Sequence, residues 1–113
     1  MAQYLISFND GDMTFPDEDL PAVAKDARAV VQEAKDAGVF VFAGGLGDPR
    51  EASVVATDGI VTNGPKLATK DFIGGVTVVD VPTRETALEW AAKIAVACRC
   101  AQEVRQFLSA PAR

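Results

Sequence analysis

The sequence contains no histidine. Its absence excludes the Ser-His and Cys-His nucleophile pairs, and with them the usual general base that titrates near neutral pH. Because most zinc sites also use histidine, we expect no metal centre. Any catalysis would have to rely on carboxylates, lysines, thiols or the single tyrosine, Tyr4.

Cysteine is almost as scarce, with only Cys98 and Cys100 in the stretch "ACRCAQ". Two thiols separated by one residue rarely reach the geometry of a relaxed disulfide. Metal ligation would need further cysteine or histidine ligands. We therefore expect both side chains to act as small apolar residues at a helix end, with a reactive thiol as the alternative.

Clusters of positive charge and long apolar runs are also missing. Eleven basic residues are scattered among sixteen acidic ones, and the net charge is −5, so we expect neither a nucleic acid nor an anionic membrane surface as partner. No window reaches the ~20 apolar residues of a membrane span, and the first residues do not resemble a signal peptide. A cytoplasmic location follows as the expectation. No glycine-rich phosphate-binding pattern occurs, and we expect no cofactor.

The 113 residues suffice for one domain, residues 1–113, with a single core between two packed layers. Alternating apolar residues predict strands, and apolar residues at three- and four-residue spacing predict helices. The expected strands are 2–8, 39–45, 52–57, 74–81 and 102–108. Residues 60–62, after a turn signal at Asp58 and Gly59, are expected as a short extended segment, and the expected helices are 19–38 and 83–98.

Local signals support the two helices. Asp19 is a plausible N-cap of the first helix and Gly38 a plausible stop. Thr83 is expected to cap the second helix, with Glu85 in its first turn, where a negative charge favours the helix dipole. The element order is then β-α-β-β-β-α-β.

Two helices on one face of a largely antiparallel sheet form a ferredoxin-like α+β layer. The other face of the sheet is left bare. In so short a chain an exposed apolar sheet face predicts association, so we expect a homodimer that pairs through this face.

The stretch "TNGPKLATKDFIGGVTVVDVPTRETALEWAAK" resembles the YCII-related (DGPF-motif) family, whose motif reads D-G-P-F-x-E-T-K-E and leads into a Gly-Gly strand and a helix beginning A-L-E-W-A. The matching positions here are Asn63-Gly64-Pro65, Thr69-Lys70-Asp71, Gly74-Gly75 and Ala87–Lys93. The stretches "GVFVFAGGL" and "QEVRQF" are similar to two further parts of the family pattern, so the resemblance spans nearly the whole chain.

The resemblance implies a dimeric α+β barrel, in which two protomers pair their sheets and each has a cleft between sheet and loops. Related members of that superfamily bind or transform small organic molecules there. Family members suspected of catalysis carry a histidine and an aspartate in the cleft, and this chain has no histidine. It also has Asn63, Lys66 and Ala68 where the motif has Asp, Phe and Glu.

The candidate ligand-binding residues are Lys70, Asp71, Arg105, Asn63 and Tyr4. Lys70 and Asp71 form either a solvated ion pair or a lysine aimed at an anionic ligand and oriented by the aspartate. Arg105 either pairs with a neighbouring strand or subunit, or binds a carboxylate. Asn63 belongs to a turn or lines a cleft mouth. Tyr4 and Ser7 point to opposite faces of the first strand, so at most one of them lines a given cleft.

Two functions remain open. The first is a small-molecule-binding homodimer without a histidine-based catalytic site. The alternative is an enzyme of low catalytic demand, performing elimination, isomerisation or lactone chemistry, with Lys70 and Asp71 as the candidate catalytic residues and a carboxylate moving the proton.

Overall fold

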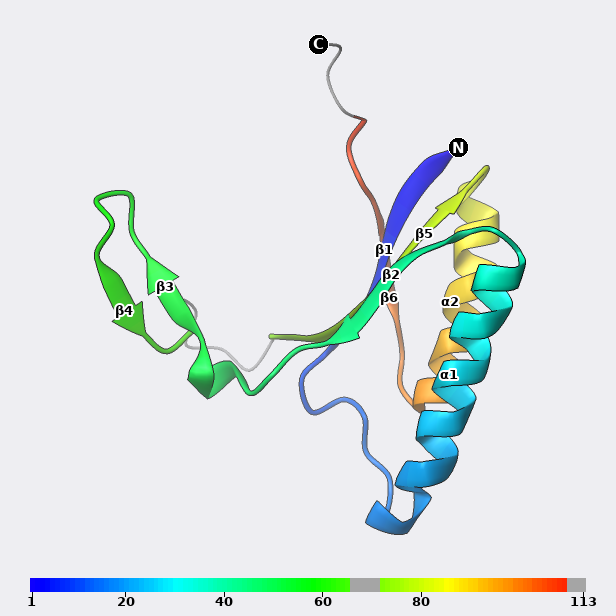
Figure 1. The fold of residues 1–113 in the computed structure, drawn as a ribbon, viewed down its shortest axis with the longest axis horizontal. Helices are drawn as coiled ribbons and strands as arrows, with labels where there is room; N and C mark the ends of the chain where they lie inside the picture. The colour runs from blue at the N-terminus through cyan, green and yellow to red at the C-terminus, as the bar shows by residue number, and fades with distance from the viewer. Residues whose placement is uncertain (66–71, 110–113) are drawn as a thin grey trace.

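The computed structural model describes residues 1–65 and 72–109. Two helices cover one face of a four-stranded antiparallel sheet (Figure 1). The strand order is β2-β5-β1-β6. The elements of this body are β1 (Ala2–Asn9), α1 (Leu20–Asp36), β2 (Phe40–Gly45), β5 (Ile73–Val81), α2 (Arg84–Cys98) and β6 (Glu103–Gln106).

This arrangement confirms the predicted α+β, ferredoxin-like fold. Each helix connects two strands that lie on either side of a third, antiparallel strand: β5 separates β1 from β2, and β1 separates β5 from β6. No helix among the described residues is long and apolar enough to cross a membrane.

The predicted third strand differs from the expectation, because it does not join the main sheet. β3 (Ser53–Val55) pairs only with β4 (Val61–Asn63), and together they form a separate two-stranded hairpin, here called the arm. The short 3₁₀ turn η2 (Pro49–Glu51) precedes the arm, and another, η1 (Asp17–Asp19), precedes α1. The arm turns at Asp58 and Gly59, as the sequence predicts; Gly59 has φ +86° and the Asp58 carboxylate accepts a hydrogen bond from the Ile60 amide at 2.9 Å.

Strand register decides which side chains lie beneath the helices. Tyr4 lies opposite Val79 and Ile6 opposite Thr77. Tyr4, Ile6 and Val79 are almost completely buried and pack in one cluster with Ala87 of α2 and its neighbours. The alternate residues of each strand consequently point to the face that the helices leave uncovered, here called the open face.

The N-terminus of α2 has the predicted cap. The Thr83 hydroxyl accepts a hydrogen bond from the Thr86 amide at 3.2 Å, which satisfies one of the free donors of the first turn. We expect Thr83→Ala to lower the free energy of unfolding by about 1 kcal/mol, whereas Thr83→Ser retains the acceptor. Urea denaturation of both variants measures the difference, and equal losses would show that the hydroxyl does not cap the helix.

Two ion pairs hold the helices side by side. The Arg99 guanidinium lies 2.9 Å from the Asp26 carboxylate, and the Lys93 ammonium lies 2.6 Å from the Glu33 carboxylate. Arg99 has the left-handed conformation that ends α2, and its guanidinium also donates to the Ala97 carbonyl at 2.6 Å. Such exposed pairs add little stability, but they link α1 and α2 at two separate places.

Where β5 begins, Gly74 allows the backbone to pass very close to β1. A Cβ atom at Gly74 would lie 2.9 Å from both the Cα and the amide nitrogen of Asp10. The β1 strand bulges here, between Phe8 and Asn9, and the Asp10 amide donates to the Phe72 carbonyl at 2.6 Å. The glycine is therefore required by close contact between two backbones.

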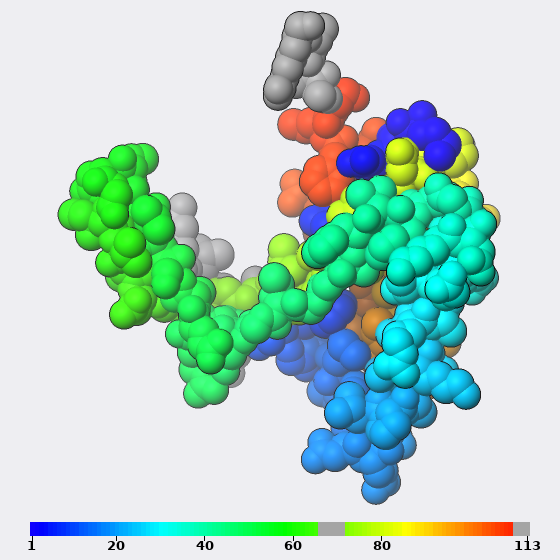
Figure 2. Space-filling model, viewed as in Figure 1, coloured from blue at the N-terminus to red at the C-terminus, as the bar shows by residue number. Residues whose placement is uncertain are grey.

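The arm makes the molecule wide and flat. It projects to the side of the sheet that the helices do not cover (Figure 1), and the space-filling view shows a broad trough between arm and body (Figure 2). The principal extents are 49 × 43 × 19 Å and the radius of gyration is 16.0 Å, against about 13 Å for a compact chain of this length. Among the described residues, most of the arm's surface is thus left without a partner.

Candidate functional site

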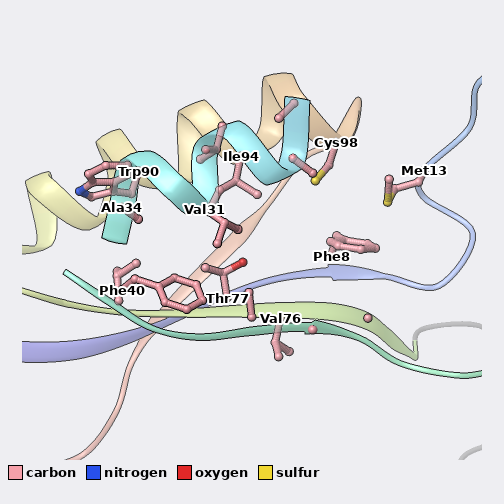
Figure 3. A pocket seen from close by; sticks show the side chains of 17 residues that line it. Phe8, Met13, Val31, Ala34, Phe40, Val76, Thr77, Trp90, Ile94 and Cys98 are labelled. Atoms are coloured by element: carbon pink, nitrogen blue, oxygen red, sulfur yellow. The ribbon is translucent and has the colours of Figure 1, made fainter. Parts of the chain in front are cut away.

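A partly enclosed cavity of about 300 Å³ lies between the helices and the sheet (Figure 3). It is lined by β1, β2 and β5 on one side, by α1 and α2 on the other, and by Met13 from the loop after β1. The lining residues are Phe8, Met13, Ala27, Val30, Val31, Ala34, Phe40, Ala43, Gly44, Gly45, Val76, Thr77, Val79, Trp90, Ile94, Ala97 and Cys98.

The cavity exists because small residues occupy positions where a core usually has large ones. Four alanines and two glycines are part of the lining. Ala34 of α1 and Ala97 of α2 are nearly buried, yet neither side chain reaches across to the sheet. On β2, Gly44 and Gly45 present only backbone. Interiors are normally packed to crystal-like density, so this gap is a distinct feature of the fold.

Aromatic rings stand at both ends of the cavity (Figure 3). Trp90 and Phe40 lie at one end, and Phe8 lies at the other with Met13 and Cys98. The Lys93 ammonium lies 5.7 Å from the centre of the Trp90 ring and the Lys35 ammonium 5.4 Å from that of Phe40, where the rings attract the positive charge. Neither lysine is part of the lining.

Polar groups are few and uncharged. Among the described residues that line it, none has an acidic or basic side chain, and the one hydroxyl belongs to Thr77 on the central strand β5. The Thr77 side chain rises from the sheet toward the helices (Figure 3), and within residues 1–65 and 72–109 it makes no hydrogen bond. The site therefore offers apolar contact and one free hydroxyl, and none of its lining side chains could act as a general base.

Cys98 is free, lines the cavity, and is about half-buried, as is Cys100 beyond it. Burial raises the pKa of the Cys98 thiol, and the neighbouring Arg99 charge offsets this only in part. Burial also raises the pKa of Cys100, with Cys98 and Asp12 adding to the effect. Both groups consequently remain protonated at neutral pH, which favours the prediction that they behave as small apolar residues.

We expect Cys98 to react slowly with iodoacetamide, because only the thiolate is nucleophilic. In a Cys100→Ala variant at pH 8, alkylation should be at least several times slower than that of free cysteine. Because burial raises the pKa of the Cys98 thiol in the folded protein, the thiol's contribution to the free energy of unfolding is complete below the ordinary thiol pKa. This contribution is lost as the pH rises through the pKa of the folded state. Alkylation as fast as that of free cysteine would show that the thiol is not shielded.

The residues predicted as ligand contacts do not come together in this cavity. Tyr4 lies on the helix side of β1, but it is buried in the core cluster beside the cavity. Arg105 lies opposite Leu5 on the open face. Asn63 is exposed at the end of the arm's second strand, opposite Ser53. Lys70 and Asp71 lie outside the described residues.

Sequence patterns did not reveal the cavity residues as a site. Thr77, Val31 and Trp90 each fit an ordinary strand or helix pattern, and Trp90 is partly buried against the core cluster. The signal for the cavity in the sequence was the combination of alanines on both helices with the Gly44-Gly45 pair on a strand.

Within the part of the chain that the structure describes, no group of three His, Cys, Asp or Glu side chains could hold a metal ion.

The sequence model of the YCII-related domain matches residues 2–108. The chain belongs to the YCII-related domain family. The match covers every strand and helix described above, the arm included. A search of curated proteins found none that matches this YCII-related chain.

Within this YCII-related domain, the Gly74-Gly75 pair of the motif now has a structural reason. Gly74 permits the close approach to Asp10, and a Cβ at Gly75 would lie 2.5 Å from the ring of Phe8. Phe8 lies across from Gly75 on the neighbouring strand and forms one end of the cavity. The second glycine thus leaves space for a ring that shapes the cavity.

Proposed function

We propose that this protein binds a small organic molecule in the cavity between helices and sheet, and that it acts as a homodimer joined through the open face. The cavity is the observation that supports ligand binding. An apolar void of about 300 Å³ would cost at most about 7 kcal/mol if it were dry and closed. That is comparable to the whole stability of a typical domain, so a ligand that fills it would stabilise the fold.

The open face supports the homodimer. Register places Phe42, Val78, Leu5 and Arg105 in one row across its four strands. Phe42 is 57% exposed and Phe107, from the end of β6, is 46% exposed. An apolar row on a sheet, bounded by polar residues, is typical of a protein–protein contact, and a second copy offers the same row in a two-fold arrangement.

A buried carboxylate oxygen on the same face also supports the homodimer. Asp80 lies opposite Gln3, and its Oδ1 atom is buried without a hydrogen-bond partner in the described residues. An unpaired buried oxygen costs about 1–3 kcal/mol. Arg105 lies on this face, and its guanidinium makes no hydrogen bond or salt bridge within residues 1–65 and 72–109. In the proposed dimer, Arg105 of one copy is a suitable donor to Asp80 of the other.

The arm adds a second reason to propose a dimer. Val55, Ile60 and Val61 are each at least 60% exposed, and the arm borders the trough in front of the open face. A partner sheet in that trough would cover the open face and contact the arm. Burial of these side chains would then contribute about 25 cal/mol per Å² of apolar surface.

Two measurements test the proposal. Sedimentation velocity at micromolar concentration should give twice the mass of the chain. A thermal-shift panel of charged and uncharged organic compounds should give at least one that raises the melting temperature of the parent but not of Val31→Phe, which places a ring in the cavity. Val96→Phe is the matched control, because Val96 is 75% exposed on the outer side of α2. A monomer, or a panel in which no compound separates parent from Val31→Phe, would contradict the corresponding half of the proposal.

A further inference from the structure

We infer that the cavity selects an uncharged, largely apolar ligand about the size of two fused aromatic rings, held by one hydrogen bond to Thr77. The inference rests on the proposed ligand site and specifies its chemistry. It differs from the anionic ligand that Arg105 suggested in the sequence, because Arg105 is not among the described residues that line the cavity.

The size of the ligand follows from the volume of the cavity. An apolar cavity of about 150 Å³ binds benzene and otherwise stays dry. The cavity here has about 300 Å³, which is enough for a bicyclic molecule or a single ring with a short chain. Its aromatic residues stand at its two ends, with Trp90 and Phe40 opposite Phe8 (Figure 3). Flat rings between such residues would gain edge-to-face or offset contacts.

The side chains of the described lining residues disfavour a charged ligand. A carboxylate or ammonium group placed among these side chains would lose its hydration without gaining an ion pair, which is strongly unfavourable. The nearest cations identified beside the cavity, Lys93 and Lys35, stand over the rings of Trp90 and Phe40 rather than in the lining, and Lys93 is already paired with Glu33. A charged ligand would therefore have to keep its charged group outside the cavity.

One polar group on the ligand is accommodated by Thr77. Its hydroxyl can donate or accept, it faces the helices from the middle of the sheet, and it has no partner in the described part of the chain. A site with a hydrogen-bonding group binds a molecule more weakly when that molecule has no donor or acceptor for the group, because the group is then left unpaired. Thr77 is thus the residue that would orient the ligand.

The test compares 2-naphthol with 2-naphthoate, which share the same rings and differ in charge at pH 7. Isothermal titration calorimetry of the full chain should show 2-naphthol binding at least ten times more tightly than 2-naphthoate. Val31→Phe and Ala97→Leu, which fill the cavity from different helices, should each abolish this binding. Val96→Phe should retain it. Quenching of Trp90, the only tryptophan, provides a second readout through energy transfer to the bound rings.

Thr77→Val removes the hydroxyl at nearly constant shape and should weaken 2-naphthol binding about fivefold, whereas Thr77→Ser should keep the parent affinity. Equal weakening by both variants would overturn the role of Thr77. Binding of 2-naphthoate as tight as that of 2-naphthol would overturn the uncharged class while leaving a ligand site in place. No binding of either compound also overturns the inference, and the charged and uncharged panel described above then decides separately whether the ligand site itself fails.

Discussion

Replacing Phe42 with glutamate is expected to convert the proposed dimer into a monomer. Phe42 lies on the edge strand β2 and is 57% exposed in the protomer, so the fold of one chain loses little. In a two-fold interface each copy loses the buried ring and gains a buried, unpaired carboxylate. Even about 2 kcal/mol per copy gives about 4 kcal/mol in total, or roughly a thousandfold weaker dimer.

Sedimentation equilibrium over a range of concentrations measures this change, and circular dichroism confirms that the variant is folded. Val96→Glu is the matched control, since it places the same charge on an exposed position of α2, on the helix side of the molecule. The control should remain a dimer. A Phe42→Glu protein with the same dimer dissociation constant as the parent would show that the chains do not meet through the open face.

Gly74→Ala is expected to destabilise the fold by about 2–3 kcal/mol, in the range found for overpacking. The added methyl group would lie 2.9 Å from the Asp10 backbone, which is fixed by its hydrogen bond to the Phe72 carbonyl. Neither strand can yield by rotating a side chain. In a domain of this size the melting temperature should fall by about 10–20 °C.

Gly45 provides the comparison, because a Cβ there meets nothing closer than the Gly74 carbonyl oxygen at 4.0 Å. Gly45→Ala therefore shares the loss of backbone freedom in the unfolded chain but not the contact with Asp10. Differential scanning calorimetry of the two variants isolates that contact. Equal melting temperatures would show that the two backbones are not held together at Gly74.

The fold was largely predictable because its signals are local. The apolar spacing in α1 and the Thr83 cap depend on residues within a few positions. The structure confirms both helices with shifts of one or two residues at their ends, but the Asp19 side chain makes no cap hydrogen bond. The arm was predictable as a turn at Asp58 and Gly59, but not as a separate unit. Strand patterning in residues 52–57 shows that a strand exists; it contains no information on which strand will be its partner.

The cavity was not predictable for a related reason. Ala34, Ala97 and Gly44 are ordinary residues in their own elements, and they leave a void only because three different elements place them around the same space. Charged residues draw attention in a sequence, so Lys70, Asp71 and Arg105 are among the candidate ligand contacts there. A binding site for an uncharged molecule is made of residues that look like core.

The presence of the arm also means that folding and the proposed assembly depend on different segments of this chain. β2 and β5 are antiparallel neighbours in the sheet, and such strands can be joined by a two-residue turn. Of the described residues between Gly45 and Ile73, Leu46 and Phe72 bond to the body, through the Gly74 carbonyl and the Asp10 amide, whereas the strands of the arm pair with each other. A chain that lacks the arm but keeps Leu46 and Phe72 should still fold its sheet and helices. In the proposed dimer, the length of the arm would then alter how copies assemble without changing the proposed ligand site.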